Sequence, residues 1–378
     1  MRVYGRTMVS EFLGDFIVYR NLIPMDNRIP TLEELRVKVG LTQNTTPRKS
    51  QLEYARVIVE QLKYARRIEL SDAQIRRLIY IGDTPLNDGT AYENLCVVGN
   101  WPGLAFIGAD KDEPTNVVTQ ATPHGYPFLL ANRWSALRDF EKNCQERGLA
   151  IDRSTAVVID LDKTALGARG RNDHVIDQAR VQAVENTVSG LLGSDYDPKT
   201  FRAAYDTLNQ LEYHSFTADN QDYLAYICLV VGSGLYPLDE LLKDLESAKI
   251  TSFLGFIEWI ETRKRELSTA LESIHADIYS AVKAGDPTPF KVFRREEFRM
   301  TVSRMGAKAD EDPVEMLLQD EIVITAEIEA LAMEWKERGA LLFALSDKPD
   351  EASIPTEELA RQGLRSIHCT ETHVVGAD

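Results

Sequence analysis

Short continuous apolar runs are the first pattern of hydrophobic positions along the chain. Four of these runs, each four or five residues long, are closed by a glycine or a polar residue. The runs are residues 78–81, 104–107, 156–159 and 341–345. Such runs, separated by helical segments, are typical of parallel strands buried on both faces of a sheet. The sequence therefore predicts an α/β fold in which polar residues after the strands meet at one edge of the sheet.

Helical periodicity is the second pattern, and it dominates the rest of the chain. Residues 50–67 carry apolar side chains three and four positions apart, which predicts an amphipathic helix before the first run. The stretches with the same period farther along are 241–248, 253–281 and 314–335. Strand-like alternation is nearly absent from 177 to 338. A large helical segment therefore interrupts the sheet-forming sequence.

These two patterns predict a sheet-containing core with one inserted helical domain. The core should comprise residues 1–170 and 335–378, and the helical domain residues 171–334. After the last apolar run, a short helix at 356–362 and a strand at 366–370 should complete the core. The predicted fold class is α/β, with a Rossmann-like parallel sheet built from two separate parts of the chain.

Composition and charge narrow the function classes. Hydrophobic residues make up 44% of the 378 residues, which is enough for a large buried core. The formal net charge of −16 disfavours extended nucleic acid and is easier to reconcile with a small phosphorylated substrate. The longest apolar stretch, residues 223–235, is too short to span a bilayer, and charged residues interrupt the N-terminal segment. We therefore expect a cytoplasmic protein without a membrane anchor. The oligomeric state is not predicted.

Cysteine and histidine residues form no recognisable metal motif in the sequence. The four cysteines are too far apart for a CxxC knuckle and too few for a disulfide framework. They are Cys96, Cys144, Cys228 and Cys369. The only close histidine pair, His368 and His373, has no third ligand nearby in the sequence. We expect reduced, mostly buried thiols and no histidine-based zinc site.

Residues 157–164 combine an apolar strand with two closely spaced carboxylates. The strand runs into Asp160, Asp162 and Thr164 in an Asp-x-Asp-x-Thr pattern. Two carboxylates at a strand end can bind a divalent cation and divide the work of phosphoryl transfer. One attacks phosphorus, and the other protonates the leaving oxygen. A strand followed by an acidic helix cap would give the same pattern without any chemistry.

The segment 157–164 resembles the first signature motif of the haloacid dehalogenase-like (HAD) superfamily. Residues 79–88 are similar to the GDxxxxD acidic motif of that family, and residues 341–349 to its strand that ends in serine. Residues 46–50 stand at a helix start, where the family's lysine normally lies. Three of the four matches follow apolar strand signals, which favours membership of the superfamily.

The resemblance implies a phosphatase site in which Asp160 is the nucleophile. Asp162 would act as the general acid, and the hydroxyl of Ser346 would contact the transferring phosphoryl group. Lys49 would neutralise the crowded carboxylates and the phosphate, with Arg48 as the alternative cation. The residues implied as ligands of a Mg²⁺ ion are Asp160, Asp162, Asp83 and Asp88.

The order of the motifs departs from the family pattern. HAD proteins ordinarily begin with the nucleophile motif and end with the acidic motif, whereas here Lys49 and Asp83 precede Asp160 and Ser346. Rotation of the order converts one arrangement into the other. The resemblance therefore implies a circularly permuted HAD core, a rearrangement tolerated where chain ends lie close together.

The same resemblance implies the order of strands in the sheet. The nucleophile strand should be central, with the serine strand on one side and the acidic strand on the other. Asp83 should then lie within about 10 Å of Asp160, because one Mg²⁺ ion with bonds of about 2.1 Å must reach both. The implied strand order is 366–370, 341–345, 156–159, 78–81 and 104–107.

The helical domain lies in the sequence where many HAD relatives carry a cap over the active site, and the resemblance implies that role. Residues 289–295 join basic and aromatic side chains, which makes Lys291 and Arg294 candidate substrate ligands. A helix start packed by its two phenylalanines explains this segment equally well. Thr164 and Lys348, beside the core motifs, are the other candidates for substrate binding.

Taken together, these features predict a Mg²⁺-dependent phosphomonoester hydrolase that acts through an aspartyl-phosphate on Asp160. A phosphotransferase or mutase with the same nucleophile is one alternative, because the first chemical step is shared. A non-catalytic protein that binds a phosphate ligand on the same scaffold is the other. The natural substrate is not predicted.

Overall fold

The computed structural model describes residues 1–42 and 45–377, and these form two compact units. The sheet unit combines residues 1–178 with the residues from 301 onward, and the helical unit comprises residues 179–300. Two helices, α6 (Asp173–Leu192) and α13 (Lys291–Val302), include residues of both units. The helical unit is therefore inserted into the sequence of the sheet unit.

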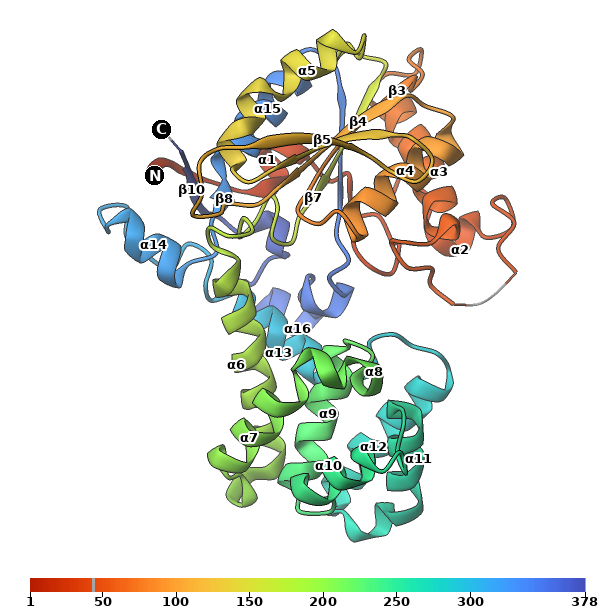
Figure 1. The fold of residues 1–378 in the computed structure, drawn as a ribbon, viewed down its shortest axis with the longest axis vertical. Helices are drawn as coiled ribbons and strands as arrows, with labels where there is room; N and C mark the ends of the chain where they lie inside the picture. The colour runs from red at the N-terminus through yellow and green to blue at the C-terminus, as the bar shows by residue number, and fades with distance from the viewer. Residues whose placement is uncertain (43–44, 378) are drawn as a thin grey trace. The chain divides into compact units, whose positions relative to one another are not determined.

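A seven-stranded, mostly parallel sheet forms the centre of the sheet unit (Figure 1). Neighbouring strands are parallel except at one edge, where β5 runs antiparallel to β6. In spatial order the strands are β2 (Ile17–Val18), β9 (Leu341–Leu345), β7 (Thr155–Asp160), β3 (Arg77–Gly82), β4 (Gly103–Gly108), β6 (Pro127–Ala131) and β5 (Val117–Ala121). The α/β class and the parallel sheet predicted from the apolar runs are confirmed.

Helices cover both faces of this sheet, which explains why its central strands are continuously apolar. Every residue of β4, β7 and β9 is buried. On one face, α3 (Leu52–Glu69) and α4 (Asn87–Gly99) pack against alternate strand residues such as Tyr80 and Val158. On the other, Phe106 contacts Phe140 of α5 (Phe140–Glu146), which in turn contacts Trp335 of α15 (Ala326–Glu337).

The strands of the four predicted apolar runs lie in the predicted order, with β7 between β9 and β3, and β4 outside β3. The strand predicted at 366–370 is wrong. Residues Ile367–Cys369 form a 3₁₀ turn, η6, because the backbone N–H of Cys369 donates to Ser366 and that of Thr370 to Ile367. The place beside β9 is taken by β2, from the other end of the chain.

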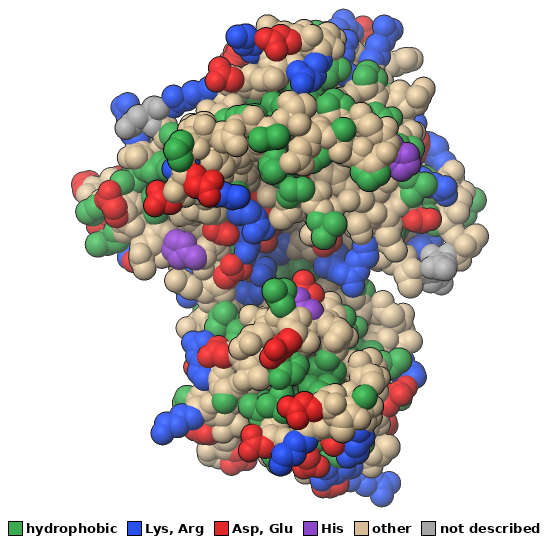
Figure 2. Space-filling model, viewed as in Figure 1, with side chains coloured by type: hydrophobic (Ala, Val, Ile, Leu, Met, Phe, Trp, Pro, Cys, Tyr) green, Lys and Arg blue, Asp and Glu red, His purple; other side chains and the backbone are tan. Residues whose placement is uncertain are grey.

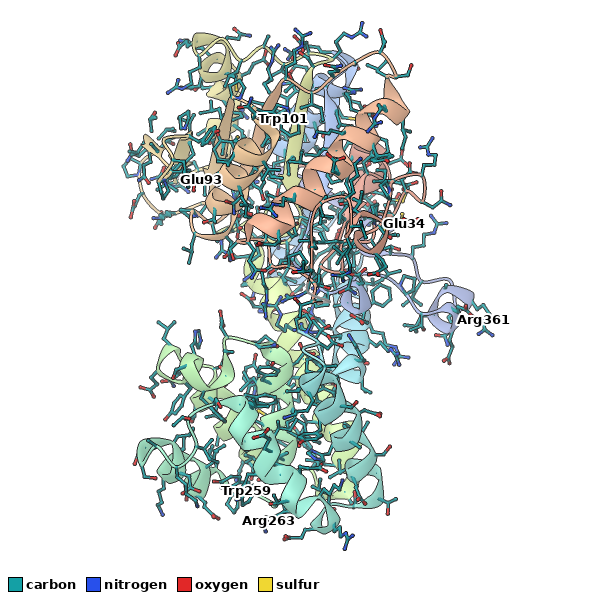
Figure 3. The ribbon with its side chains drawn as sticks, turned by 90° about the vertical axis from the view of Figure 1, so that its right-hand side faces the viewer. Glu34, Glu93, Trp101, Trp259, Arg263 and Arg361 are labelled. Carbon is teal, nitrogen blue, oxygen red and sulfur yellow. The ribbon has the colours of Figure 1, made fainter. Side chains whose placement is uncertain are left out.

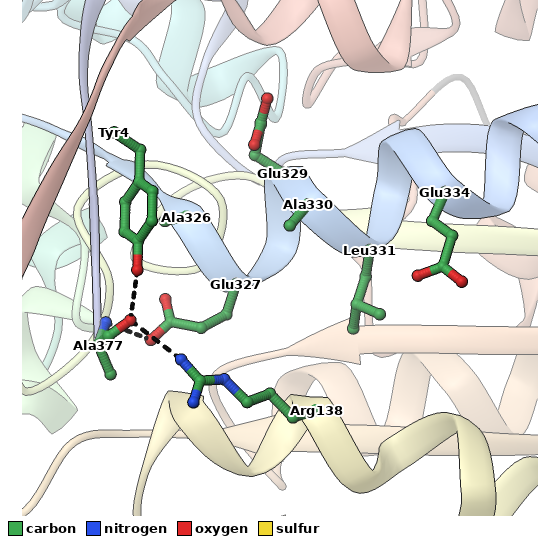
Figure 4. A pocket seen from close by; sticks show the side chains of 9 residues that line it. All are labelled: Tyr4, Arg138, Ala326, Glu327, Glu329, Ala330, Leu331, Glu334 and Ala377. Carbon is green, nitrogen blue, oxygen red and sulfur yellow. Dashed lines mark hydrogen bonds between the residues drawn. The ribbon is translucent and has the colours of Figure 1, made fainter.

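A second, three-stranded sheet joins the first and last strands of the chain. The C-terminal strand β10 (Thr372–Gly376) pairs antiparallel with β1 (Arg2–Thr7) and parallel with β8 (Ile324–Thr325). Beyond β10, the carbonyl of Ala377 accepts hydrogen bonds from Tyr4 and Arg138 in a pocket beside α15 (Figure 4). Its backbone N–H donates to Glu327.

The helical unit packs around its own apolar core, which its helices share. The helices within residues 179–300 are α7 (Pro198–Leu208), α8 (His214–Thr217), α9 (Gln221–Gly232), α10 (Leu238–Glu246), α11 (Phe253–Arg263) and α12 (Thr269–Lys283). The continuous period at 253–281 divides into two helices, because a 3₁₀ turn follows α11 and the side chain of Ser268 caps α12. On α11, the guanidinium of Arg263 lies over the ring of Trp259 (Figure 3).

The helical unit is shorter than the segment 171–334 that the periodicity predicts. Residues 301–334 belong to the sheet unit. They include α14 (Val314–Asp320) and β8, which pairs with β10, and most of α15. Helical periodicity cannot distinguish a helix that packs on a sheet from one that packs on other helices, which explains the wider prediction. The short helices α1 (Val9–Leu13), α2 (Leu32–Leu35) and α16 (Glu357–Arg361) also belong to the sheet unit.

The cysteines are mostly buried, and charged side chains of both signs lie on the surface. All four cysteines lie in the described part of the chain as free thiols, and three of them are buried. On the face seen in Figure 2, Lys and Arg side chains are interspersed with Asp and Glu side chains on each unit. None of the helices formed by residues 1–42 and 45–377 combines the length and hydrophobicity needed to cross a bilayer.

A buried arginine ties four segments of the sheet unit together. Arg171, in the loop after β7, donates through Nε to Asp110, which follows β4. Its two terminal nitrogens donate to the carboxylate of Glu327 on α15 at 2.9 Å, and one of them also contacts the carbonyl of Val375 on β10. Because the Arg171 side chain is only 2% exposed, these partners replace water as its hydrogen-bond acceptors.

We predict that Arg171→Met lowers the free energy of unfolding by about 3–5 kcal/mol, because it leaves two buried carboxylates without their cation. Urea denaturation monitored by tryptophan fluorescence measures the change. Arg153→Met is the matched control, since Arg153 pairs with Asp72 at an exposed position where a salt bridge is worth at most about 1 kcal/mol. Equal losses for the two variants would contradict the structural role of Arg171.

Candidate active site

Three aspartates converge beyond the carboxyl ends of two central strands. Asp160 ends β7, Asp83 follows β3, and Asp88 lies in the first turn of α4. One carboxylate oxygen of each lies within 4.8 Å of the other two, and all three residues are buried. Asp83 and Asp160 therefore meet within the expected distance, although 77 positions separate them in the sequence. The register of the parallel strands explains this, since Ile81 is paired with Ile159, two residues before Asp83 and one residue before Asp160.

Lys49 bridges two of the three carboxylates. Its ammonium group lies 2.5 Å from Asp88 Oδ1 and 2.5 Å from Asp160 Oδ1, and its side chain is 6% exposed. Burial opposes the charge on Lys49, but the carboxylates of Asp160 and Asp88 outweigh it and raise the pKa of the ammonium group. Arg48 is exposed. Of the two cations that the sequence left open, Lys49 is thus the one in the aspartate cluster.

Asp88 is held in place by five hydrogen bonds. Its Oδ2 accepts from the backbone N–H of Asp83 and from both the N–H and the hydroxyl of Thr84. Its Oδ1 accepts from Lys49 and from the hydroxyl of Tyr80. Burial disfavours its charge, but Lys49 and these hydrogen bonds prevail and lower the pKa of Asp88. Asp88 is therefore a fixed anion.

The glycine that ends β3 makes this arrangement sterically possible. A Cβ atom on Gly82 would lie 2.5 Å from Cγ of Asp88, far inside van der Waals contact. The missing side chain lets the Asp88 carboxylate approach the strand end and reach the backbone N–H groups of the following turn. The glycine of the Gly-Asp pair is therefore a packing requirement of the aspartate cluster.

Asp160 and Asp83 are less readily ionised than Asp88. Burial raises the pKa of Asp160 to about 7, against the opposing charge of Lys49. Burial also raises the pKa of Asp83 to about 9, reinforced by the carboxylates of Asp160 and Asp88. Arg169 lies 2.5 Å from Asp83 but is partly exposed, and its charge offsets only part of this effect. The cluster thus holds more acid groups than its two cations can neutralise.

The other residues predicted for the core site lie in the segments that follow β7 and β9. Ser346 directly follows β9, beside Asp160, and is 1% exposed. Its Oγ accepts a hydrogen bond from the backbone N–H of Lys348, which is itself buried. Thr164 is fully buried, and its hydroxyl has no hydrogen-bond partner among the described residues. Asp162 is half-buried and does not belong to the group of three converging carboxylates, so the geometry favours three of the four predicted metal ligands.

Lys291 and Arg294, the predicted substrate ligands of the helical segment, bind partners on that segment. Arg294 is buried, and its guanidinium donates to Asp222 and Glu297. Its hydrogen bonds hold α13 to α9, which favours the alternative of a packed helix start for this residue. Lys291 is half-buried and donates to the hydroxyl of Thr288.

Two residues of the aspartate cluster were missed by the sequence analysis. Tyr80 lies within an apolar strand, where the sequence pattern predicts a residue of the hydrophobic core. Its hydroxyl nevertheless donates a hydrogen bond to Asp88. Arg169 lies in the loop after the Asp-x-Asp-x-Thr motif, and its place beside Asp83 depends on the path of that loop. The two arginines at 169 and 171, close after the motif, are the sequence feature that could have indicated a cation beside the aspartates.

The donor atoms of the cluster suit a hard divalent cation. All three converging groups are carboxylates, and Mg²⁺ prefers oxygen ligands in octahedral geometry. Bonds of about 2.1 Å place such ligands about 3.0–4.2 Å apart, so the observed separations need only a small contraction. A cation would also balance the surplus of buried acid groups. Asp83, Asp88 and Asp160 are therefore the residues that could hold it.

Comparison with known proteins identifies no relative for this chain: no protein-family model, curated protein or solved structure matches it.

We predict that Asp83→Asn stabilises the cation-free protein increasingly as the pH rises. The folded chain holds the Asp83 proton up to a pKa of about 9, whereas an unfolded aspartate has a pKa of about 3.9. The stabilisation from this proton is complete below about pH 4 and is lost as the pH rises toward 9. Asparagine does not ionise, so the stability of the variant relative to the natural chain should increase by up to about 5 kcal/mol between pH 5 and pH 9, at about 1.4 kcal/mol per pH unit.

Thermal unfolding at pH 5, 7 and 9 in the presence of a chelator measures this gain. The exposed Asp72 provides the control, because Asp72→Asn should change stability by a small amount that does not grow with pH. A difference between Asp83→Asn and the natural chain that stays constant across this range would show that Asp83 ionises freely in the fold.

Proposed function

We propose that this protein is a Mg²⁺-dependent phosphomonoester hydrolase of the HAD-like superfamily, with Asp160 as the nucleophile. The observation that carries the proposal is the buried cluster of Asp83, Asp88 and Asp160 around Lys49, with Ser346 at the adjacent strand end. A buried group of carboxylates with strongly perturbed pKa values at the carboxyl edge of a parallel sheet is a typical functional site.

The strand order supports the family assignment and the circular permutation. The strands before Asp160, Ser346 and Asp83 are neighbours, in the arrangement that the resemblance implies. The pairing of β1 with β10 also brings the first and last strands together, as a permuted order requires. We further propose that the helical unit acts as a cap, because its sequence is inserted between Asp160 and Ser346.

The contacts of Asp160 suit a nucleophile. Lys49 holds Oδ1 at 2.5 Å, whereas no described residue donates a hydrogen bond to Oδ2. Oδ2 is therefore the oxygen that attacks phosphorus. Its bond to phosphorus forms as the bond to the leaving alcohol breaks, and Asp162 gives that alcohol its proton. The positive charge of Lys49 favours the ionised form of Asp160 before the attack.

The second step restores the carboxylate. A water molecule attacks the phosphorus of the aspartyl-phosphate, Asp162 accepts a proton from it, and inorganic phosphate leaves with Asp160 regenerated. The hydroxyl of Ser346 binds an oxygen of the transferring group throughout. Mg²⁺ held by the three carboxylates would neutralise the charge on the phosphoryl oxygens.

The first test is metal-dependent hydrolysis of a generic aryl phosphate. We expect activity with Mg²⁺ that a chelator abolishes, because the carboxylates alone would repel the phosphate. Asp160→Asn should lower kcat by at least about 10³-fold, since it removes the nucleophile while keeping the size of the side chain. Asp72→Asn, at an exposed position, is the control for purification and fold. Full activity after chelation, or in Asp160→Asn, would refute the proposal.

A second test separates the general acid from the nucleophile. Asp162→Asn should lower kcat/KM for an alkyl phosphate about 10²-fold more than for a nitrophenyl phosphate, because only the poor leaving group needs a proton in the transition state. Steady-state kinetics with the two substrates give the ratio. Equal losses with both substrates would assign Asp162 a role other than proton donation.

A further inference from the structure

A second group of metal-ligating side chains lies on other elements of the sheet unit. Asp15 lies between α1 and β2, and His368 and Cys369 lie in η6. One potential ligand atom of each residue lies within 4.8 Å of the other two. Because more than 350 positions separate Asp15 from His368, the sequence shows only the two adjacent residues.

His368 is held by a partner that suits a metal ligand. Its Nδ1 lies 2.9 Å from the hydroxyl of Tyr19, and both side chains are buried. A hydrogen bond at one ring nitrogen fixes the orientation of the imidazole, as the partners of metal-binding histidines do. Burial also lowers the pKa of His368 to about 4, so the ring is neutral at physiological pH.

Cys369 is the cysteine that solvent can reach. Cys96, Cys144 and Cys228 are buried, whereas Cys369 is partly exposed and lines an open pocket of about 410 Å³. The pocket provides a route by which an ion can reach the sulfur. A metal binds the thiolate form of cysteine, so binding at Cys369 would release the thiol proton.

The donor set points to a borderline-soft metal rather than to Mg²⁺. One sulfur, one imidazole nitrogen and one carboxylate oxygen are ligands of Zn²⁺, at about 2.3, 2.0 and 2.0–2.2 Å respectively. In a tetrahedral site such ligands lie about 3.3–3.7 Å apart. Asp15 is exposed, in the short segment between α1 and β2, and its side chain can close the remaining distance.

We propose that Asp15, His368 and Cys369 form a Zn²⁺ site with three protein ligands and a fourth position for water or an external ligand. The ion would cross-link the segment before β2 to η6, and thus join the two ends of the sheet unit beside β9. The proposal does not depend on the phosphatase activity, since no residue of the aspartate cluster contributes to it.

Cobalt titration of the full-length protein in excess Mg²⁺ tests the site, because Co²⁺ bound to a thiolate gives a charge-transfer absorption that oxygen ligands do not. We expect this absorption in the natural chain, its displacement by Zn²⁺ and its loss in Cys369→Ser. Asp15→Asn should weaken Co²⁺ binding at least about tenfold, since it removes one of three ligands. Glu11→Gln is the matched control, because it removes an exposed carboxylate of α1, four residues before Asp15, and should leave the affinity unchanged.

Thermal unfolding supplies a second measurement that does not depend on the colour of cobalt. Zn²⁺ should raise the melting temperatures of the natural chain and of Glu11→Gln, because an ion that binds only the folded state stabilises it. The melting temperature of Asp15→Asn should rise much less. Equal Co²⁺ affinities for Asp15→Asn and Glu11→Gln, or an absorption that survives in Cys369→Ser, would overturn the proposal.

Discussion

The bridge that Lys49 makes between Asp88 and Asp160 is the contact on which the candidate active site depends. Each partner is buried, so neither carboxylate can rely on water for its charge, and the ammonium group supplies the compensation at 2.5 Å to both. The bridge also fixes geometry, because Lys49 precedes α3, Asp88 lies in the first turn of α4 and Asp160 ends β7. One cation therefore links the starts of two helices of the sheet unit to the carboxyl end of the central strand.

The two groups of potential metal ligands differ in chemistry, and this difference would allow each to select its own ion. Asp83, Asp88 and Asp160 offer only carboxylate oxygens in a buried place, which suits a small, hard cation. Asp15, His368 and Cys369 offer oxygen, nitrogen and sulfur closer to solvent, which suits a softer one. Ligand type rather than affinity alone would then keep two metals apart within one sheet unit.

The parts of the fold that the sequence predicts are those where one physical requirement acts over a continuous segment. Burial on both faces makes β3, β4, β7 and β9 continuously apolar, and the polar residue after each strand marks the edge where Asp83, Asp160 and Ser346 meet. The family resemblance predicts that Asp88 and Lys49 join Asp160 at this edge of the sheet.

What the sequence does not predict depends on contacts between distant segments. The strand β2 has only two residues, too few to show a period. It is defined by the pairing of Ile17 and Val18 with β9, more than 300 positions away in the sequence. The residues at 366–370 have the composition of a strand, yet local hydrogen bonds turn them into η6. Arg169 reaches Asp83, and Asp15 reaches His368, through loop paths that no local pattern encodes.

The pairing of β1 with β10 and of β2 with β9 has a consequence for how the chain is made. Residues 2–7 and 17–18 have their strand partners after residue 340, so they stay unpaired while the helical unit is synthesised. Residues 179–300 are contiguous and can acquire their packed core during translation, whereas the sheet unit closes only once residues 341–376 have been made. This closure pairs segments more than 300 positions apart, and pairing over such sequence distances is slow because the loop between them must be closed first.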